Sequence, residues 1–226
     1  MDKMNIYIIP GNAATEQAGQ VLREAGVAVS SGLCPKATHW LLPVPTKIPV
    51  NAPPGVMVIG GNLAVPGMDL LKDPFYLAEN AAITARCAMT LIGKELNGLP
   101  VLVLGWGRIG KCLGKFLAEE GAEVTIAARK EADVAMVRAL GYKGIFLHEA
   151  PPLLTRFDAV VNTIPALVLT ASGCRKDCVL LELASQPGMA GGNIMDGRGL
   201  PGKYAPEESG QLIARTILRL CEEEEA

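Results

Sequence analysis

Short runs of aliphatic and β-branched residues alternate along the chain with longer stretches of helical periodicity. This alternation is typical of a parallel sheet covered by helices. In the first part of the chain, strands are expected at Asn5–Ile9, His39–Leu42 and Val56–Ile59. A helix capped by Asn12 is expected after the first strand, and the prolines of Pro43–Gly55 exclude that segment from a central strand. The pattern therefore predicts a small three-strand α/β unit.

A second unit is expected after a long stretch rich in small residues, Asp73–Gly93, which we interpret as a helix connecting two lobes. The strands expected in this unit are Val101–Leu104, Glu123–Ala127, Gly144–Leu147, Ala159–Asn162 and Cys178–Leu183. Its helices are expected near Arg108–Glu120 and Glu131–Leu140, and a last helix at Pro206–Cys221 precedes an acidic end. The expected organisation is a small lobe (1–73), a connecting helix (74–97), a doubly wound Rossmann-type domain (98–204) and a C-terminal segment (205–226).

The composition narrows the possible partners. The chain has 226 residues, of which 50% are hydrophobic and 19% charged, with a net charge of −2. No apolar run is long enough for a membrane span, and no secretory signal is visible. A near-neutral charge with 4% aromatic residues argues against a nucleic-acid surface. The six cysteines are scattered without a zinc pattern, so we expect no metal site, and we expect reduced thiols in a cytoplasmic protein.

The stretch PVLVLGWGRIGKCLGKFL carries a dinucleotide-binding fingerprint. Gly105, Gly107 and Gly110 have the G-x-G-x-x-G spacing, follow an apolar strand and open an amphipathic helix. The first glycine suits a tight turn, the second a close approach of backbone to pyrophosphate, and the third helix–strand packing. Arg108 and Ile109 belong to the same phosphate-binding turn. The alternative is a glycine turn in an ordinary βαβ unit.

The stretch VTIAARK, at the end of the following strand, indicates which nucleotide would bind. An NAD site places a carboxylate there for the ribose 2′-hydroxyl, whereas an NADP site offers arginine to the 2′-phosphate. Here Ala127 and Ala128 lead to Arg129 and Lys130, with no acid among them. The sequence therefore predicts NADP(H) in preference to NAD(H). The alternative is a solvated basic helix start.

Ligands of such sheets lie beyond the carboxyl ends of the strands, which directs attention to the loops after the later strands. Asn162, Thr163, Ile164 and Pro165 follow one strand, and Ser185, Gln186, Pro187 and Gly188 follow the next. The segment 199–205 precedes the last helix. Polar groups interleaved with proline and glycine suit a rigid site with exposed backbone amides.

Four motifs in order resemble the family of the dipicolinate synthase A subunit of spore-forming bacteria. They are LAENAAIT, GWGRIGKCLGKFLAEEGAEVTIAARK, NTIPALVLT with LELASQPGMAGG, and GLPGKYAPEESGQLIA. The resemblance covers roughly residues 74–220 and implies a Rossmann domain with a flavodoxin-like N-terminal lobe. It also implies an NAD(P)-linked dehydrogenase half of a two-part sporulation enzyme whose partner is a flavoprotein-like B subunit. That enzyme oxidises a dihydrodipicolinate-pathway intermediate to dipicolinate. The N-terminal lobe is short for the family, and Lys203, Tyr204 and Glu207 depart from its pattern.

A dicarboxylate substrate needs cations and oriented donors. Candidate cations are Lys203, Arg198, Lys47 and Arg108, although Arg108 better suits the cofactor. The candidate catalytic set is Asn162, Ser185 and Lys203. Thr163, Ile164 and Pro165 are assigned to the cofactor, and the substrate-binding set is Pro43, Val44, Pro45, Thr46, Pro187 and Gly188. His148 is expected near the adenine side, and His39 starts a strand at the end away from a cleft.

Two other functions remain open from the sequence. One is a catalytically silent NADP-binding module that senses redox state or regulates a partner. The other is a dehydrogenase of a different small carboxylic acid, although the cleft lacks the Arg and Glu–His set of 2-hydroxy-acid enzymes. The long helix of small residues also predicts a homo-oligomer.

Overall fold

The computed structural model describes residues 4–32 and 34–225. They form two compact units. The first unit comprises the described residues up to Ile83 and from Pro201 onward, and the second is Thr84–Leu200. Helix α2 (Pro74–Ile92) contributes residues to both. Among the described residues, none of the helices combines the length and the apolar character that a membrane span requires.

The first unit is built on a parallel sheet of five strands in the order β2-β1-β3-β4-β5. These strands are β1 (Asn5–Ile8), β2 (Ala28–Ser30), β3 (His39–Leu41), β4 (Met57–Gly60) and β5 (Met68–Asp69). This is the flavodoxin-like order, with its reversal between β1 and β3. The expected count of three strands was therefore wrong. The two missed strands are edge strands of three and two residues, too short to show a periodicity.

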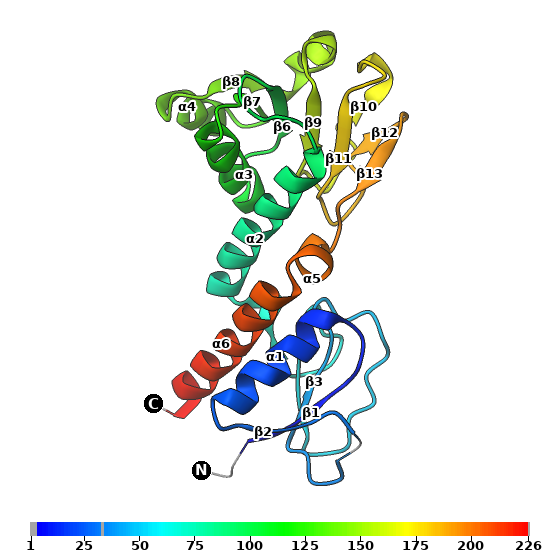
Figure 1. Cartoon of the computed structure of the whole chain (residues 1–226), viewed down its shortest axis with the longest axis vertical. Coiled ribbons are helices and arrows are strands. Elements are labelled where there is room, and N and C mark those ends of the chain that lie inside the picture. The colour runs from blue at the N-terminus through cyan, green and yellow to red at the C-terminus, as the bar shows by residue number, and fades with distance from the viewer. Residues whose placement is uncertain (1–3, 33, 226) are drawn as a thin grey trace. The chain divides into compact units, whose positions relative to one another are not determined.

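Helix α6 (Pro206–Glu225) belongs to the first unit, where it packs along α1 (Ala13–Glu24), as the two neighbouring ribbons in Figure 1 show. A Cβ added at Gly210 would lie 2.8 Å from the carbonyl oxygen of Ala14 and 2.8 Å from the nitrogen of Ala18. The glycine therefore permits direct approach of the two helices. The helix also continues beyond its expected end at Cys221, where Arg219 pairs with Glu223 at 2.8 Å.

The second unit is built on a parallel sheet of six strands in the order β13-β11-β9-β6-β7-β8. These are β6 (Pro100–Leu104), β7 (Glu123–Ala128), β8 (Lys143–Phe146), β9 (Ala159–Asn162), β11 (Val179–Glu182) and β13 (Ile194–Asp196). Helices α3 (Arg108–Glu119) and α4 (Glu131–Ala139) follow β6 and β7. The unit also contains a small parallel sheet of two strands, β10 (Leu169–Thr170) and β12 (Met189–Ala190). Three 3₁₀ helices are present as well: η2 (Leu147–Glu149), η3 (Pro151–Arg156) and η4 (Ala171–Gly173).

Strand β13 (Ile194–Asp196) was missed because it lies in the glycine-rich segment Gly191–Gly202, whose sequence shows no strand pattern. Gly191, Gly192 and Gly199 adopt positive φ values of 74°, 80° and 74°, so the turns on both sides of the strand depend on glycine. Only three residues between them pair with β11. A strand of three residues shows little alternation of polar and apolar residues, so its pairing with β11 decides that it forms.

The core of the second unit explains why its central strands read as continuous apolar runs. Val101, Leu102, Val103 and Leu104 of β6 are all fully buried, as are the residues of β9. A parallel sheet covered on both faces buries successive side chains alike. The buried cluster on one face extends from Leu102 and Leu104 to Leu154 and Phe157.

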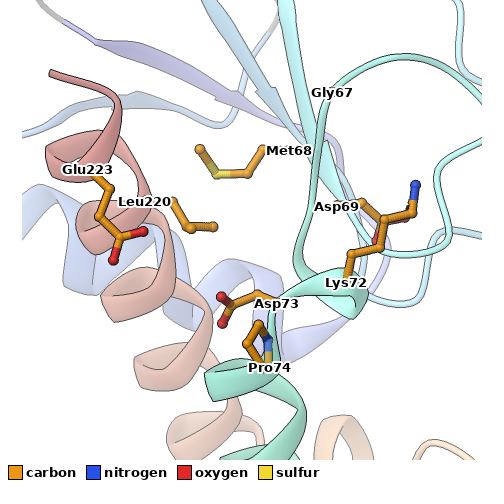
Figure 2. Close-up of a pocket in the computed structure, with 8 residues that line it drawn as sticks. All are labelled: Gly67, Met68, Asp69, Lys72, Asp73, Pro74, Leu220 and Glu223. Atoms are coloured by element: carbon orange, nitrogen blue, oxygen red, sulfur yellow. Dashed lines mark ion pairs between the residues drawn. The ribbon is translucent and has the colours of Figure 1, made fainter. Parts of the chain in front are cut away.

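Asp73 anchors the start of α2 to α6 within the first unit. Its Oδ1 accepts the N–H of Tyr76 at 2.7 Å, and its Oδ2 lies 2.7 Å from Arg219. Figure 2 shows Asp73 beside a pocket of about 450 Å³ whose lining includes Asp69 and Glu223. Desolvation acts to raise the pKa of Asp73, but the Tyr76 N–H and the Arg219 guanidinium outweigh it and hold this pKa below its ordinary value.

The close contact at Gly210 predicts a large effect of one added methyl group. Gly210→Ala should lower the free energy of unfolding of the first unit by about 1–3 kcal/mol, because backbone atoms of α1 cannot move aside cheaply. Gly202→Ala is the matched control, since nothing lies within 4 Å of a Cβ there. Urea unfolding followed by Trp40 fluorescence in a Trp106→Phe background reports on this unit. Equal stability of the two alanine variants would contradict the packing described.

The lowered pKa of Asp73 predicts an acid-dependent contribution to stability. The ionised carboxylate stabilises the fold above the ordinary Asp pKa of about 3.9, and this contribution disappears as the pH falls through the lower folded value. Asp73→Asn keeps the helix cap but removes the charge. It should be less stable than wild type by less than about 1 kcal/mol at neutral pH, and the difference should vanish once the pH lies below the folded pKa of Asp73. Thermal unfolding of both proteins between about pH 2 and 7 measures this.

Candidate nucleotide-binding site

The turn after β6 has the geometry that the glycine fingerprint predicts. Gly105 has a φ of +106°, and its N–H donates to the carbonyl oxygen of Ala127 at 2.8 Å. A Cβ at Gly105 would lie 2.5 Å from Oγ1 of Thr163. A Cβ at Gly110 would lie 2.3 Å from the carbonyl oxygen of Gly105. Both glycines are therefore required by local packing, and the turn holds α3 directly against the strand.

Gly107 differs from its two neighbours in the fingerprint. A Cβ at this position would meet nothing within 4 Å, and the φ of −81° is open to any residue. Gly107 is the N-cap of α3, and no side chain caps the free N–H groups of the first turn, which includes Arg108 and Ile109. The fold therefore does not require a glycine here. An open position beside unpaired N–H groups suits the close approach of a pyrophosphate.

The end of β7 lies beside this turn, because Leu104 pairs with Ala127 in the sheet. Ala127 and Ala128 are buried, whereas Arg129 and Lys130 are exposed. Lys130 is the N-cap of α4, and no side chain caps that helix either. The first acid after the strand is Glu131, inside α4. The position of a ribose-binding carboxylate is therefore taken by alanine and then by two cationic side chains.

The next strand outward, β8, ends in an aromatic pair. Phe146 pairs with Ala128 across the sheet, and its ring stacks on that of His148 with centroids 5.5 Å apart. Glu149 accepts the N–H of Phe146 at 2.7 Å and so fixes the turn. His148 thus lies in η2, directly after the carboxyl end of β8.

On the other side of the glycine turn, the loops after β9 and β11 are joined by a buried hydrogen-bond network. Asn162 is fully buried; its Nδ2 donates to the carbonyl oxygen of Ile164 at 2.9 Å and to Glu182 at 2.8 Å. Its Oδ1 accepts the N–H of Ile164 at 3.1 Å. Thr163 donates its hydroxyl to the carbonyl oxygen of Leu104 at 2.8 Å, and Pro165 is exposed. The amide of Asn162 is therefore occupied by the protein itself.

Glu182, at the end of β11, is a functional candidate that sequence reasoning missed. It is 5% exposed and accepts hydrogen bonds from three backbone N–H groups besides Asn162. Glu182 contacts Ala184 and Gly188, and the three residues between these two, Ser185–Pro187, form an exposed loop tip. Gly188 itself is buried. A charged residue inside the apolar run VLLELA was the available signal, because a carboxylate is rarely buried without specific partners.

The remaining candidates fall in different places. Thr46 donates to the carbonyl oxygen of Pro43 at 2.9 Å and accepts the N–H of Gly61 at 3.2 Å, so its hydroxyl shapes the loop that also holds Val44 and Pro45. Lys47 and Lys203 are exposed in the first unit. Arg198, after β13, forms a two-point ion pair with Asp196, and these hydrogen bonds raise the pKa of its guanidinium.

The structure therefore brings together the cofactor candidates of the second unit. In strand order β8-β7-β6-β9-β11-β13, the reversal falls between β6 and β9, where the turn at Gly105–Gly110 meets Thr163 and Ile164. This is the strand order of dinucleotide-binding Rossmann domains, whose ligands bind where the order reverses. The chain has an α/β NAD(P)-binding dehydrogenase-like fold with two parallel sheets.

Comparison with known proteins shows which proteins the chain resembles in sequence. No family model matches the chain. It is 31% identical over 142 residues to the A subunit of dipicolinate synthase of Bacillus subtilis (strain 168), an alignment that covers 58% of this chain and 48% of that protein. The aligned region thus spans about half the length of that relative. The resemblance inferred from the motifs is confirmed.

Solved structures agree on the fold. The structure of the dipicolinate synthase A subunit from Bacillus halodurans has a TM-score of 0.84 at 22% identity, covering 96% of this chain and 97% of that one. An L-alanine dehydrogenase has a TM-score of 0.62 at 13% identity, covering 90% of this chain and 77% of that one. The chain is thus similar to the dipicolinate synthase A subunit in sequence and in fold.

The open position at Gly107 predicts a variant that separates binding from folding. Gly107→Ala should unfold within a few degrees of wild type, because the added methyl group meets no protein atom and an N-cap change costs about 1 kcal/mol. We expect it nevertheless to lose most nucleotide affinity, because the methyl group would occupy the space that the fingerprint predicts for a phosphate. Calorimetry with NADPH and thermal unfolding measure the two effects. Normal NADPH affinity in this variant would mean that the turn does not contact a phosphate.

Proposed function

We propose that the chain is an NADP(H)-preferring oxidoreductase of the dipicolinate synthase A type. The observations that carry the proposal are the turn Gly105–Gly110 at the reversal of strand order, with its open position at Gly107, and the exposed Arg129 and Lys130 after the neighbouring strand β7. When bound, the nicotinamide of NADP⁺ would accept a hydride. The turn at Gly105–Gly110 would hold the pyrophosphate through backbone N–H groups, with Arg108 and Ile109 in the same turn.

The preference for NADP(H) follows from charge. A 2′-phosphate carries close to two negative charges and three strong acceptor oxygens. The planar guanidinium of Arg129 can donate two parallel hydrogen bonds to it, and Lys130 adds a second cation. NAD(H), with a hydroxyl in that position, would find no acceptor carboxylate among Ala128, Arg129 and Lys130. Both the gain for one nucleotide and the loss for the other favour NADP(H).

The proposed substrate is a cyclic dicarboxylate of the dihydrodipicolinate pathway. Oxidation of a dihydropyridine-type ring releases a hydride to the nicotinamide and a proton to solvent, and it leaves an aromatic pyridine. Aromatisation drives this step, so a strong general base is not needed. Ser185, at the exposed tip of the loop after β11, is proposed to orient the ring. A flavoprotein-like B subunit is the proposed partner, as the similarity to the Bacillus subtilis protein suggests.

A second candidate function is a catalytically silent NADP-binding module. Two observations favour it over other enzymes. Asn162 is fully buried, and its amide is used within the protein, so it does not offer a donor to a substrate. Arg198 is paired with Asp196 through two hydrogen bonds of 2.8 Å. Tight NADPH binding with no turnover of dihydrodipicolinate-type substrates, with or without the B subunit, would favour this module.

The proposed phosphate clamp predicts a change in nucleotide preference on removal of one side chain. Arg129→Ala should weaken NADPH binding about tenfold or more, the loss expected for a hydrogen bond to a charged group, and leave NADH affinity nearly unchanged. Isothermal titration calorimetry with both nucleotides measures the preference.

Arg156→Ala is the matched control for this experiment, because Arg156 is also exposed in the second unit but precedes the amino end of β9. It should bind both nucleotides as wild type does. Retention of the full NADPH preference in Arg129→Ala would remove the clamp from the proposal. Failure of the wild-type protein to bind either nucleotide would remove the oxidoreductase proposal itself.

A further inference from the structure

We infer that Glu182 is a positioning residue whose buried carboxylate holds the loop Ser185–Pro187 ready for the nicotinamide half of the dinucleotide. The inference rests on the proposed function and deepens it. It assigns the second half of the site, which the glycine fingerprint does not describe. It also explains why the carboxylate of Glu182 is buried, since an apolar side chain would fill the same space without the cost of burying a charge.

The carboxylate of Glu182 joins both ends of the loop. Oε1 accepts the N–H of Ala184 at 3.0 Å, immediately before the exposed tip. Oε2 accepts the N–H of Gly188 at 2.7 Å and that of Met189 at 3.2 Å, immediately after the tip. Hydrogen bonds to an ionised acceptor are stronger than neutral ones, and these are buried. The three-residue tip is therefore closed by one side chain, with little freedom to rearrange.

The same carboxylate fixes the loop to the neighbouring strand. Its Oε1 also accepts a hydrogen bond from Nδ2 of Asn162 at 2.8 Å, at the end of β9. Gly188 is wedged beside that amide, since a Cβ there would lie 2.1 Å from Nδ2 of Asn162 and 2.6 Å from the carbonyl oxygen of Ile164. The carbonyl oxygen of Gly188 in turn accepts the N–H of Val168 at 2.8 Å. The loops after β9 and β11 thus form one rigid piece.

The position of this piece in the sheet indicates which part of a ligand it meets. A Rossmann sheet consists of two mononucleotide-binding halves on either side of the strand-order reversal. The half formed by β6, β7 and β8 carries the glycine turn and Arg129, so it serves the adenosine side. The half formed by β9, β11 and β13 must then serve the nicotinamide side. The loop Ser185–Pro187 emerges at the carboxyl edge of that half.

The negative charge, and not only the shape, is needed for this arrangement. Each of the four partners of Glu182 is a donor: three backbone N–H groups and the amide of Asn162. A glutamine has the same shape, but its NH₂ group would face two donors whichever way the amide is turned. Glu182→Gln should therefore leave buried donors without acceptors and release one end of the loop.

The test compares two nucleotide probes on the full chain. NADPH uses both halves of the site, whereas adenosine 2′,5′-bisphosphate occupies the adenosine half alone. Calorimetry should show that Glu182→Gln binds NADPH about tenfold or more weakly, while its affinity for the bisphosphate is unchanged. Glu123→Gln is the matched control, because Glu123 is exposed at the opposite, amino-terminal end of β7. It should bind both probes as wild type does.

A second variant covers the case in which Glu182→Gln does not fold. Pro187→Gly leaves the carboxylate in place but frees the exposed tip, so it should also weaken NADPH binding selectively. NADPH binding at wild-type strength in both variants would overturn the inference. Equal loss of both probes in a folded Glu182→Gln protein would overturn it too, since the carboxylate would then support the whole sheet. If wild type binds the bisphosphate but not NADPH, the inference fails while the adenosine site stands. If it binds neither, the proposed function fails first.

Discussion

Parallel pairing is the constraint on which the rest of this structure depends. Every strand pair described in the two sheets is parallel, so all the strands of a sheet end at one edge. Each connection between two strands must therefore cross a face of the sheet to reach the start of the next strand. In both sheets, successive strands are added on one side of the first strand and later, after one change, on its other side. In the second unit the reversal falls between β6 and β9, the position at which ligands of such sheets bind. The polar residues that end or follow β9 and β11 lie at this edge because every strand of a parallel sheet ends there.

Close approach of backbone to backbone then decides where glycine is required. At Gly110 an added Cβ would meet the carbonyl oxygen of Gly105, and at Gly188 it would meet Asn162. These two contacts lie on either side of the reversal and hold its two loops. Gly107 lies in the same turn as Gly110, and a Cβ there would meet no protein atom within 4 Å. Gly105 and Gly110 of the fingerprint are thus required by the fold, whereas the packing of the described residues does not require a glycine at Gly107.

The features that depend on local pattern could be predicted from the sequence. The five longer strands of the second unit, the glycine turn and the exposed Arg129 all follow from residues close together in the chain. The short strands β2, β5 and β13 depend on their partners and could not be read from three or fewer residues of pattern. The burial of Asn162 and the role of Glu182 were missed for a related reason. They bond to each other across 20 positions of sequence, and only the sheet brings them together.

The proposed function places different chemical demands on the two halves of the second sheet, and their side chains differ in the same sense. A phosphate is strongly charged, so exposed cations such as Arg129 and Lys130 can recognise it without a rigid frame. A nicotinamide ring carries few polar groups, and a hydride moves to it only when the reacting atoms are closely aligned. Recognition on that side must come from the placement of backbone and small side chains. A buried carboxylate that closes a loop at both ends supplies such placement, because its bonds are strong and its partners are fixed to two strands. Such a half-site works by alignment, and it needs no strong acid or base beside the reacting ring.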